Sequence, residues 1–114
     1  MKTIGESALS SRDRAIVEKI REVVWGLLPD ATVILFGSRA RGDAAADSDW
    51  DLLVLTEMVD RTIEKTIYSA LFEVELDENI IINVLVIERD DWEYKHFDGH
   101  PMKKKVEIEG VMVA

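Results

Sequence analysis

Residues 80–87 constrain the fold of this chain more than any other segment. Their sequence is Ile-Ile-Ile-Asn-Val-Leu-Val-Ile, in which Asn83 is the one polar residue. Branched apolar side chains favour extended backbone, and a run of this length is typical of a strand rather than of a core helix. Continuous apolarity predicts that this strand is buried on both faces, as in a sheet covered by helices.

Two shorter strands are predicted earlier in the chain. Residues 32–36 are branched or aromatic and lie between turn-forming residues. Residues 51–56 begin with an aspartate and continue as Leu-Leu-Val-Leu-Thr. Between these strands, Ser38 is a good N-cap and begins a short helix predicted over residues 38–41, and residues 42–47 form a loop.

A long amphipathic helix is predicted over residues 10–28. Apolar residues recur there at helical spacing, and Ser10 with Asp13 resembles a capping box that uses aspartate in place of glutamate. Pro29 ends the helix, because the residue before a proline disfavours helical backbone. The apolar positions are Ile16, Ile20, Val23, Val24, Leu27 and Leu28.

A second long helix is predicted from residue 60 to about residue 75, with Asp60 as its N-cap. The end of this segment also fits a strand, because Phe72 and Leu76 belong to an apolar series that alternates with acidic residues, and residues 77–79 could form a hairpin turn. We favour the helix, since its apolar spacing begins well before Phe72. The spaced positions are Ile63, Ile67, Leu71 and Val74.

The last part of the chain is predicted to add two short helices. One covers residues 89–95, and the other covers residues 102–109 and ends at Gly110, with a loop at 98–101 between them. This order of elements predicts a small α/β or α+β fold in which helices pack on a β-sheet. At 114 residues the chain suits one domain, which we assign to residues 1–114.

Charge and composition limit the partners. The formal net charge is −9, whereas a surface that binds free nucleic acid normally neutralises phosphates with lysine and arginine. Free nucleic acid is therefore disfavoured as a partner, although Mg²⁺ between carboxylates and phosphates would still allow a nucleotide to bind. No apolar run approaches the ~20 residues of a membrane span, and the N-terminal residues lack a signal-like apolar core. We therefore expect a cytoplasmic protein without a membrane segment.

Two groups of residues beside the predicted strands are candidates for a functional site. Gly37 and Ser38 follow the first strand, where a glycine turn lets a phosphate approach backbone N–H groups at the start of a helix. Asp49 and Asp51 lie at the start of the next strand, and alternation along a strand places both carboxylates on one face and Trp50 on the other. Two adjacent carboxylates repel each other unless a cation lies between them. The sequence therefore predicts a metal site beside a phosphate site.

Each group also has a purely structural explanation. Ser38 could simply cap the short helix, and Asp49 with Asp51 could form a solvated strand end. Asp51, however, leads directly into an apolar run, where an unpaired carboxylate is costly. The combination of both groups is therefore more specific than either group alone.

The same residues resemble those of minimal nucleotidyltransferase domains, in the DNA polymerase beta-like nucleotidyltransferase superfamily. Gly-Ser-Arg-Ala-Arg-Gly covers residues 37–42, and Ser-Asp-x-Asp-Leu covers residues 48–52. The agreement extends over most of the chain, from a leading helix to a final Glu109-Gly110. The resemblance implies the nucleotidyltransferase fold, with a small mixed sheet packed by helices.

The resemblance also implies a reaction. A nucleoside monophosphate would be transferred from a nucleoside triphosphate, with ATP as the first choice, to a hydroxyl acceptor. Asp49 and Asp51 would be the catalytic residues and would bind Mg²⁺, with two ions able to act on the attacking and leaving oxygens.

Four residues are implied to bind the nucleotide. Gly37 and Ser38 would contact its triphosphate. Arg39 and Arg41 are candidates for stabilising its charge, and the alternative is that both are solvated helix residues.

One departure from the family pattern bears on activity. Active members usually place a third carboxylate on the following strand, where this chain has Asn83. An amide can coordinate or hydrogen-bond, but it is neutral and a poor base. Glu75, Glu78 and Glu88 are close in sequence but do not lie clearly within the strand. We therefore predict either a weak transferase or one that relies on a partner for the missing group.

An alternative function is a catalytically impaired interaction module. Stand-alone domains of this size resemble the antitoxin halves of toxin–antitoxin pairs, whose partner is a small helical protein of the HEPN type. In that setting the chain could modify its partner or only mask it. A fold that has lost its function is a third option, against which the retention of both aspartates argues. The sequence leaves open whether the chain forms homo-oligomers.

Overall fold

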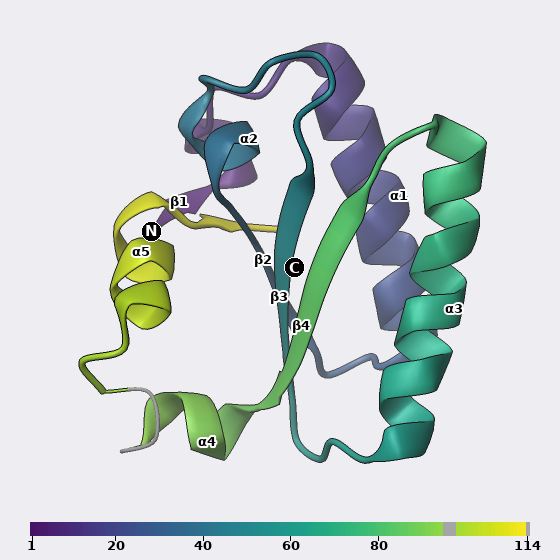
Figure 1. Cartoon of the computed structure of the whole chain (residues 1–114), viewed down its shortest axis with the longest axis vertical. Helices are drawn as coiled ribbons and strands as arrows, with labels where there is room; N and C mark the ends of the chain where they lie inside the picture. Colours follow the sequence, from purple (N-terminus) through teal and green to yellow (C-terminus); the bar gives the residue numbers. More distant parts are fainter. Residues whose placement is uncertain (95–97, 114) are drawn as a thin grey trace.

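The computed structural model describes residues 1–94 and 98–113, which form a five-stranded sheet with helices on both faces (Figure 1). The strand order is β1-β5-β2-β3-β4. β2 (Thr32–Phe36) runs antiparallel to β3 (Trp50–Thr56) and to β5 (Val111–Met112). β3 runs parallel to β4 (Ile82–Glu88). The predicted fold class, a mixed sheet packed by helices, is confirmed.

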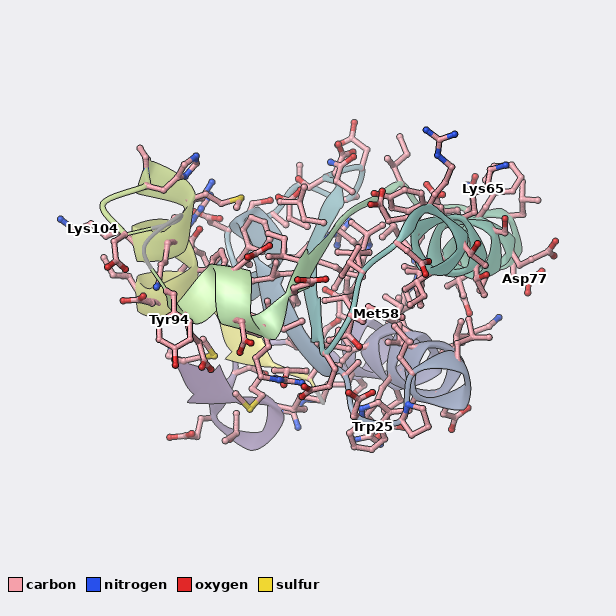
Figure 2. All side chains as sticks on the ribbon, turned by 90° about the horizontal axis from the view of Figure 1, so that it is seen from below. Trp25, Met58, Lys65, Asp77, Tyr94 and Lys104 are labelled. Carbon is pink, nitrogen blue, oxygen red and sulfur yellow. The ribbon has the colours of Figure 1, made fainter. Side chains whose placement is uncertain are left out.

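Two long helices, α1 (Ser11–Leu27) and α3 (Arg61–Glu78), lie side by side on one face of the sheet (Figure 1). Their N-caps are those expected, because Ser10 and Asp60 each accept a hydrogen bond from a backbone N–H three residues later. In Figure 2, Lys65 and Asp77 point away from the sheet. The apolar sides of both helices pack against the strands and form a large core. Residues of this core include Ile16, Val17, Ile20, Val24, Ile67, Leu71, Val74, Val33, Leu35, Leu52 and Val54.

α3 is helical to Glu78, so the hairpin alternative for its end is wrong. The alternation of apolar and acidic residues there arises because Phe72 and Leu76 lie on the outer side of the helix, where they are 54% and 63% exposed. Asn79 ends the helix in the left-handed conformation, with φ 55°, which asparagine adopts more readily than most residues.

The other face of the sheet carries α4 (Arg89–Glu93) and α5 (Pro101–Glu109) (Figure 1). α4 ends at Glu93, so its predicted continuation through Tyr94 is wrong, because Tyr94 has extended backbone; predicted residue 95 lies outside the described residues. α5 begins one residue earlier than predicted, because proline fits the first helical position, where its missing N–H costs no hydrogen bond. The core on this face is smaller and consists of Ile34, Phe36, Leu53, Leu55, Trp92 and Val106.

The prediction that residues 80–87 are buried on both faces is wrong, because side chains on one face of this edge strand are exposed. Ile82 packs against the α1–α3 core, but Ile81 is 57% and Leu85 40% exposed. The strand also begins at Ile82 rather than Ile80, whose N–H donates to the Glu75 carbonyl at the end of α3. The start of β4 therefore has one face open to solvent.

Two short strands and a single turn of 3-10 helix were not predicted. β1 (Lys2–Thr3) runs parallel to β5, and η1 (Ile4–Glu6) follows it. Strands of two residues are too short to show an alternating pattern. In the described ranges, no helix combines the length and apolarity needed to cross a membrane.

Candidate active site

The start of β3 brings the two predicted catalytic aspartates together with Asn83. Asp51 lies opposite Asn83 in the register of β3 and β4. The Asn83 Nδ2 donates to Asp49 Oδ2 at 3.0 Å and to Asp51 Oδ1 at 3.2 Å. Both carboxylates therefore lie on the same face of the sheet, while Trp50 between them is fully buried on the α1–α3 side. These positions agree with the alternation predicted from sequence.

The space between the two carboxylates suits a cation. The Asn83 amide N–H groups, which are the positive end of a dipole, already lie there. Carboxylate oxygens are the ligands that Mg²⁺ prefers, and half a turn of the Asn83 amide would offer its carbonyl oxygen as well. Within residues 1–94 and 98–113, no group of three or more histidine, cysteine, aspartate or glutamate side chains could hold a metal. The protein ligands here would be two carboxylates and an amide.

The three glutamates near β4 do not supply a third carboxylate. Glu75 Oε2 accepts from the Ile82 N–H at 2.9 Å. Glu78 forms an ion pair with Lys19 at 3.5 Å. Glu88 is at the far end of the strand, where it accepts from the backbone of the loop before α3. Asn83 contacts both aspartates, and its assignment to the position of the family's third acid stays a prediction.

Gly37 lies against Asp51 and requires glycine for two reasons. Its φ is 77°, in the left-handed region, and a Cβ would overlap with Asp51 Oδ2. Gly37, and not Ser38, is the N-cap of α2 (Ser38–Arg41), and no side chain caps that helix. The explanation that Ser38 serves as the cap is therefore wrong. The first N–H groups of α2 have no partner within the helix, as at any helix start.

Glu109, at the end of α5, contacts the Gly37 turn and is a site residue that sequence reasoning missed. Its Oε1 accepts from the Gly37 N–H at 3.2 Å, and its Oε2 accepts from Arg41 Nη1 at 2.8 Å. The hydrogen bond to Glu109, followed by one to Asp43, raises the pKa of Arg41. The one sequence signal was the Glu109-Gly110 pair, which the family resemblance included without a role.

Arg39 and Arg41 differ in their surroundings. The Arg39 side chain is only 10% exposed, so the alternative that it is a solvated helix residue is wrong. Its Nη2 donates to the carbonyls of Ala46 and Ser48, both at 3.0 Å, and its guanidinium stacks 4.8 Å from the centre of the Trp50 ring. Arg39 thus fastens the loop that carries Asp49. Arg41 is 41% exposed and lies beside the Gly37 turn. Nucleotide contact by either arginine stays a prediction.

An open groove of about 820 Å³ is lined by Asp51 and Asn83 together with residues of α3, β4, β2 and α5. Its walls are mostly apolar and include Tyr68, Phe72 and Leu85, which are 43%, 54% and 40% exposed. Asp51 and Asn83 thus border a groove with room for an acceptor molecule.

A mixed sheet that brings two aspartates and a glycine turn to one end defines the chain as a nucleotidyltransferase domain. The chain belongs to the nucleotidyltransferase domain family, whose family model matches residues 17–113. No curated protein sequence matches the chain significantly.

Solved structures agree with this fold. A toxin–antitoxin structure with AMP-PNP superposes with a TM-score of 0.64 at 16% identity, covering 86% of this chain and 72% of the other. The structure of a tri-AMPylated HEPN toxin from Shewanella oneidensis with its MNT antitoxin gives 0.59 at 14% identity, over 89% and 71%. A Sulfolobus solfataricus protein assigned as a nucleotidyltransferase gives 0.51 at 24% identity, over 72% of each chain. At these identities the likeness establishes the fold.

Proposed function

We propose that this chain is a Mg²⁺-dependent transferase that moves a nucleoside monophosphate from a nucleoside triphosphate, with ATP as the first choice, to a hydroxyl acceptor. The observation that carries the proposal is the convergence of Asp49, Asp51 and Asn83 beside the Gly37 turn. We place this activity in the cytoplasm.

In the proposed reaction, a bond forms between the acceptor oxygen and the α-phosphorus, the bond from the α-phosphorus to the β-phosphate oxygen breaks, and pyrophosphate leaves. Asp49 and Asp51 would hold the Mg²⁺, which would neutralise the charge that develops on the phosphoryl oxygens. Gly37 and Ser38 would bind the triphosphate through backbone N–H groups, and Arg41 would add a positive charge.

Asn83 would make the acceptor step slow. An amide cannot take the proton that the acceptor hydroxyl releases, so the proton would pass to water or to a partner's base. Asn83 instead positions both aspartates through its amide group. The proposal is therefore of a weak transferase unless a partner supplies the base.

The first test is nucleotide binding. ATP with Mg²⁺ at 100 times its Kd should stabilise the chain by about 2.7 kcal/mol, measured as the shift of thermal unfolding. Asp51→Asn should lose the part of this shift that needs Mg²⁺. A wild-type chain that no nucleoside triphosphate stabilises, with or without Mg²⁺, would contradict the proposal.

The second test concerns Asn83. In a labelling assay with α-³²P-ATP and a small helical protein of the HEPN type as acceptor, Asn83→Asp should raise the initial rate roughly 100-fold, at the lower end of general-base contributions. The control is Glu93→Asp, which changes an exposed acidic residue of α4 and should leave the rate unchanged. A wild type as fast as Asn83→Asp would contradict the idea that the missing acid limits the rate.

The second candidate function is an interaction module that binds a small helical protein of the HEPN type. The observation in its favour is the groove next to the site, whose exposed Tyr68, Phe72 and Leu85 offer an apolar surface to a protein partner. Complex formation with such a partner that persists in Asp51→Asn, without transfer of label in the wild type, would favour this function over the first.

A further inference from the structure

The Gly37 turn, where the proposed function places the triphosphate, already holds an anion that belongs to the chain. Glu109 Oε1 accepts from the Gly37 N–H at 3.2 Å, and Glu109 Oε2 accepts from Arg41 at 2.8 Å. Lys105 Nζ lies 3.8 Å from Glu109 Oε1. A carboxylate and a phosphate seek the same partners, namely backbone N–H groups and guanidinium groups. Glu109 is therefore an anion that already uses the hydrogen-bond donors expected to bind a phosphate.

The backbone around Glu109 is fixed by packing. Val106, one turn earlier in α5, is fully buried in the smaller core. Gly110 follows Glu109, and a Cβ there would overlap with the Val106 carbonyl and lie 2.9 Å from Ile34 Cγ2 on β2. The end of α5 thus lies directly on β2, and the Glu109 side chain is only 12% exposed. Its contact with Gly37 follows from how α5 is anchored.

We propose that Glu109 is a specificity-determining residue of the nucleotide site, which competes with the phosphates of the nucleotide for the Gly37 N–H and for Arg41. A nucleotide that uses these two donors must displace the carboxylate, and the two anions repel each other while both are near the turn. Only a ligand with several phosphates gains enough new contacts to offset this loss. Glu109 thereby lowers the affinity for phosphate-bearing ligands and leaves the affinity for the nucleoside part unchanged.

This inference rests on the proposed function, because it requires that nucleotides bind at the Gly37 turn. The chain offers a matched control. Glu107 lies two residues earlier in α5 and is exposed, and its side chain makes no hydrogen bond or ion pair to any residue that the structure describes. Glu107→Gln and Glu109→Gln remove the same charge from the same helix, so their difference isolates the contact with the turn.

The test is isothermal titration of the wild type, Glu109→Gln and Glu107→Gln with ATP, tripolyphosphate and adenosine, each with Mg²⁺. Glu109→Gln should lower the Kd for ATP and for tripolyphosphate about 10-fold, as expected when one charge-assisted hydrogen bond no longer has to be broken. Its Kd for adenosine should equal that of the wild type, and Glu107→Gln should match the wild type for all three ligands.

Two results would overturn the inference. One is a wild type that binds ATP and a Glu109→Gln variant that binds it equally or more weakly, which would leave the proposed function intact. The other is a wild type and variants that bind neither ATP nor tripolyphosphate, which would remove the proposed function as well. If Glu109→Gln does not fold, Glu109→Asp decides the question, because its carboxylate is one methylene shorter and should also bind ATP more tightly than the wild type.

Discussion

One face of the sheet is covered by the two long helices α1 and α3, whereas the other is covered only in part by the short helices α4 and α5. The covered face holds the larger core, with Val17, Ile20 and Leu52 fully buried. On the other face the start of β4 is uncovered, and there Asn83 meets the two aspartates. The comparison shows how a small domain separates tasks: one face of the sheet stabilises the fold, and the incompletely covered face carries polar groups that a full core would exclude.

The largest expected effect compares one leucine from each face. Leu52→Ala should lower the free energy of unfolding by about 2–5 kcal/mol, because the side chain is fully buried in the larger core. Leu85→Ala should cost less than about 1 kcal/mol, because Leu85 is 40% exposed on the open face. Urea denaturation measures both values. Equal losses would show that the open face is covered in solution, for example by another copy of the chain.

A second comparison concerns two glycines with nearly the same φ angle. Gly37 has φ 77° and Gly99 has φ 75°, but a Cβ at Gly99 would meet no atom within 4 Å. Gly99→Ala should cost about 1 kcal/mol for backbone strain alone. Gly37→Ala should cost at least about twice as much, because its Cβ would also displace the Asp51 carboxylate.

The same urea experiment compares the two glycine variants, and an ATP titration extends it. We expect Gly37→Ala to lose nucleotide binding and Gly99→Ala to keep it. If both variants lose the same stability and both bind ATP, the close contact between the turn and Asp51 would have no role.

The smallest expected effect tests whether the paired carboxylates on the open face lower the stability of the fold. Without metal, Asp51→Asn should change the free energy of unfolding by less than about 1 kcal/mol, and in the stabilising direction, because it removes the repulsion from Asp49. Asp90→Asn, an exposed aspartate at the start of α4, serves as the control and should not stabilise. Thermal unfolding in EDTA measures the change. A clear loss of stability would mean that the Asn83 hydrogen bond to Asp51 outweighs the repulsion.

Sequence patterns predicted the covered face well, because helical spacing records directly which residues meet the sheet. β2 and α2 have the predicted limits, and the buried positions Ile67, Leu71 and Val74 are those predicted to face the core. The position of β4 was not predictable in the same way, since an apolar run does not record whether its neighbours cover one face or both. The order of strands in the sheet, which makes β4 an edge, is set by contacts between distant parts of the chain.

In the candidate site, too, some residue positions could be predicted from local patterns and others depend on long-range contacts. The shared face of Asp49 and Asp51 could be predicted from alternation along one strand, and the position of Asn83 could be predicted from its place in the next strand. Glu109 lies 72 residues from Gly37 in sequence, and their contact depends on how the end of α5 packs against β2. Arg39 was expected to face solvent or nucleotide, but the burial of Trp50 gives its guanidinium a ring to stack on and nearby carbonyls to bind. Local patterns carry no record of such long-range contacts.

Glu75 has a consequence for how copies of this chain meet one another. The Trp50 N–H donates to the Ile81 carbonyl, so the backbone groups of Ile82 and of alternate residues after it point away from β3. An open strand edge of this kind can pair with a strand of another molecule and begin aggregation. Glu75 bonds to the Ile82 N–H at 2.9 Å and leaves a carboxylate on the edge. An approaching copy, itself of net charge −9, would meet an occupied donor and a like charge at Ile82, so Glu75 disfavours strand pairing at the start of this edge.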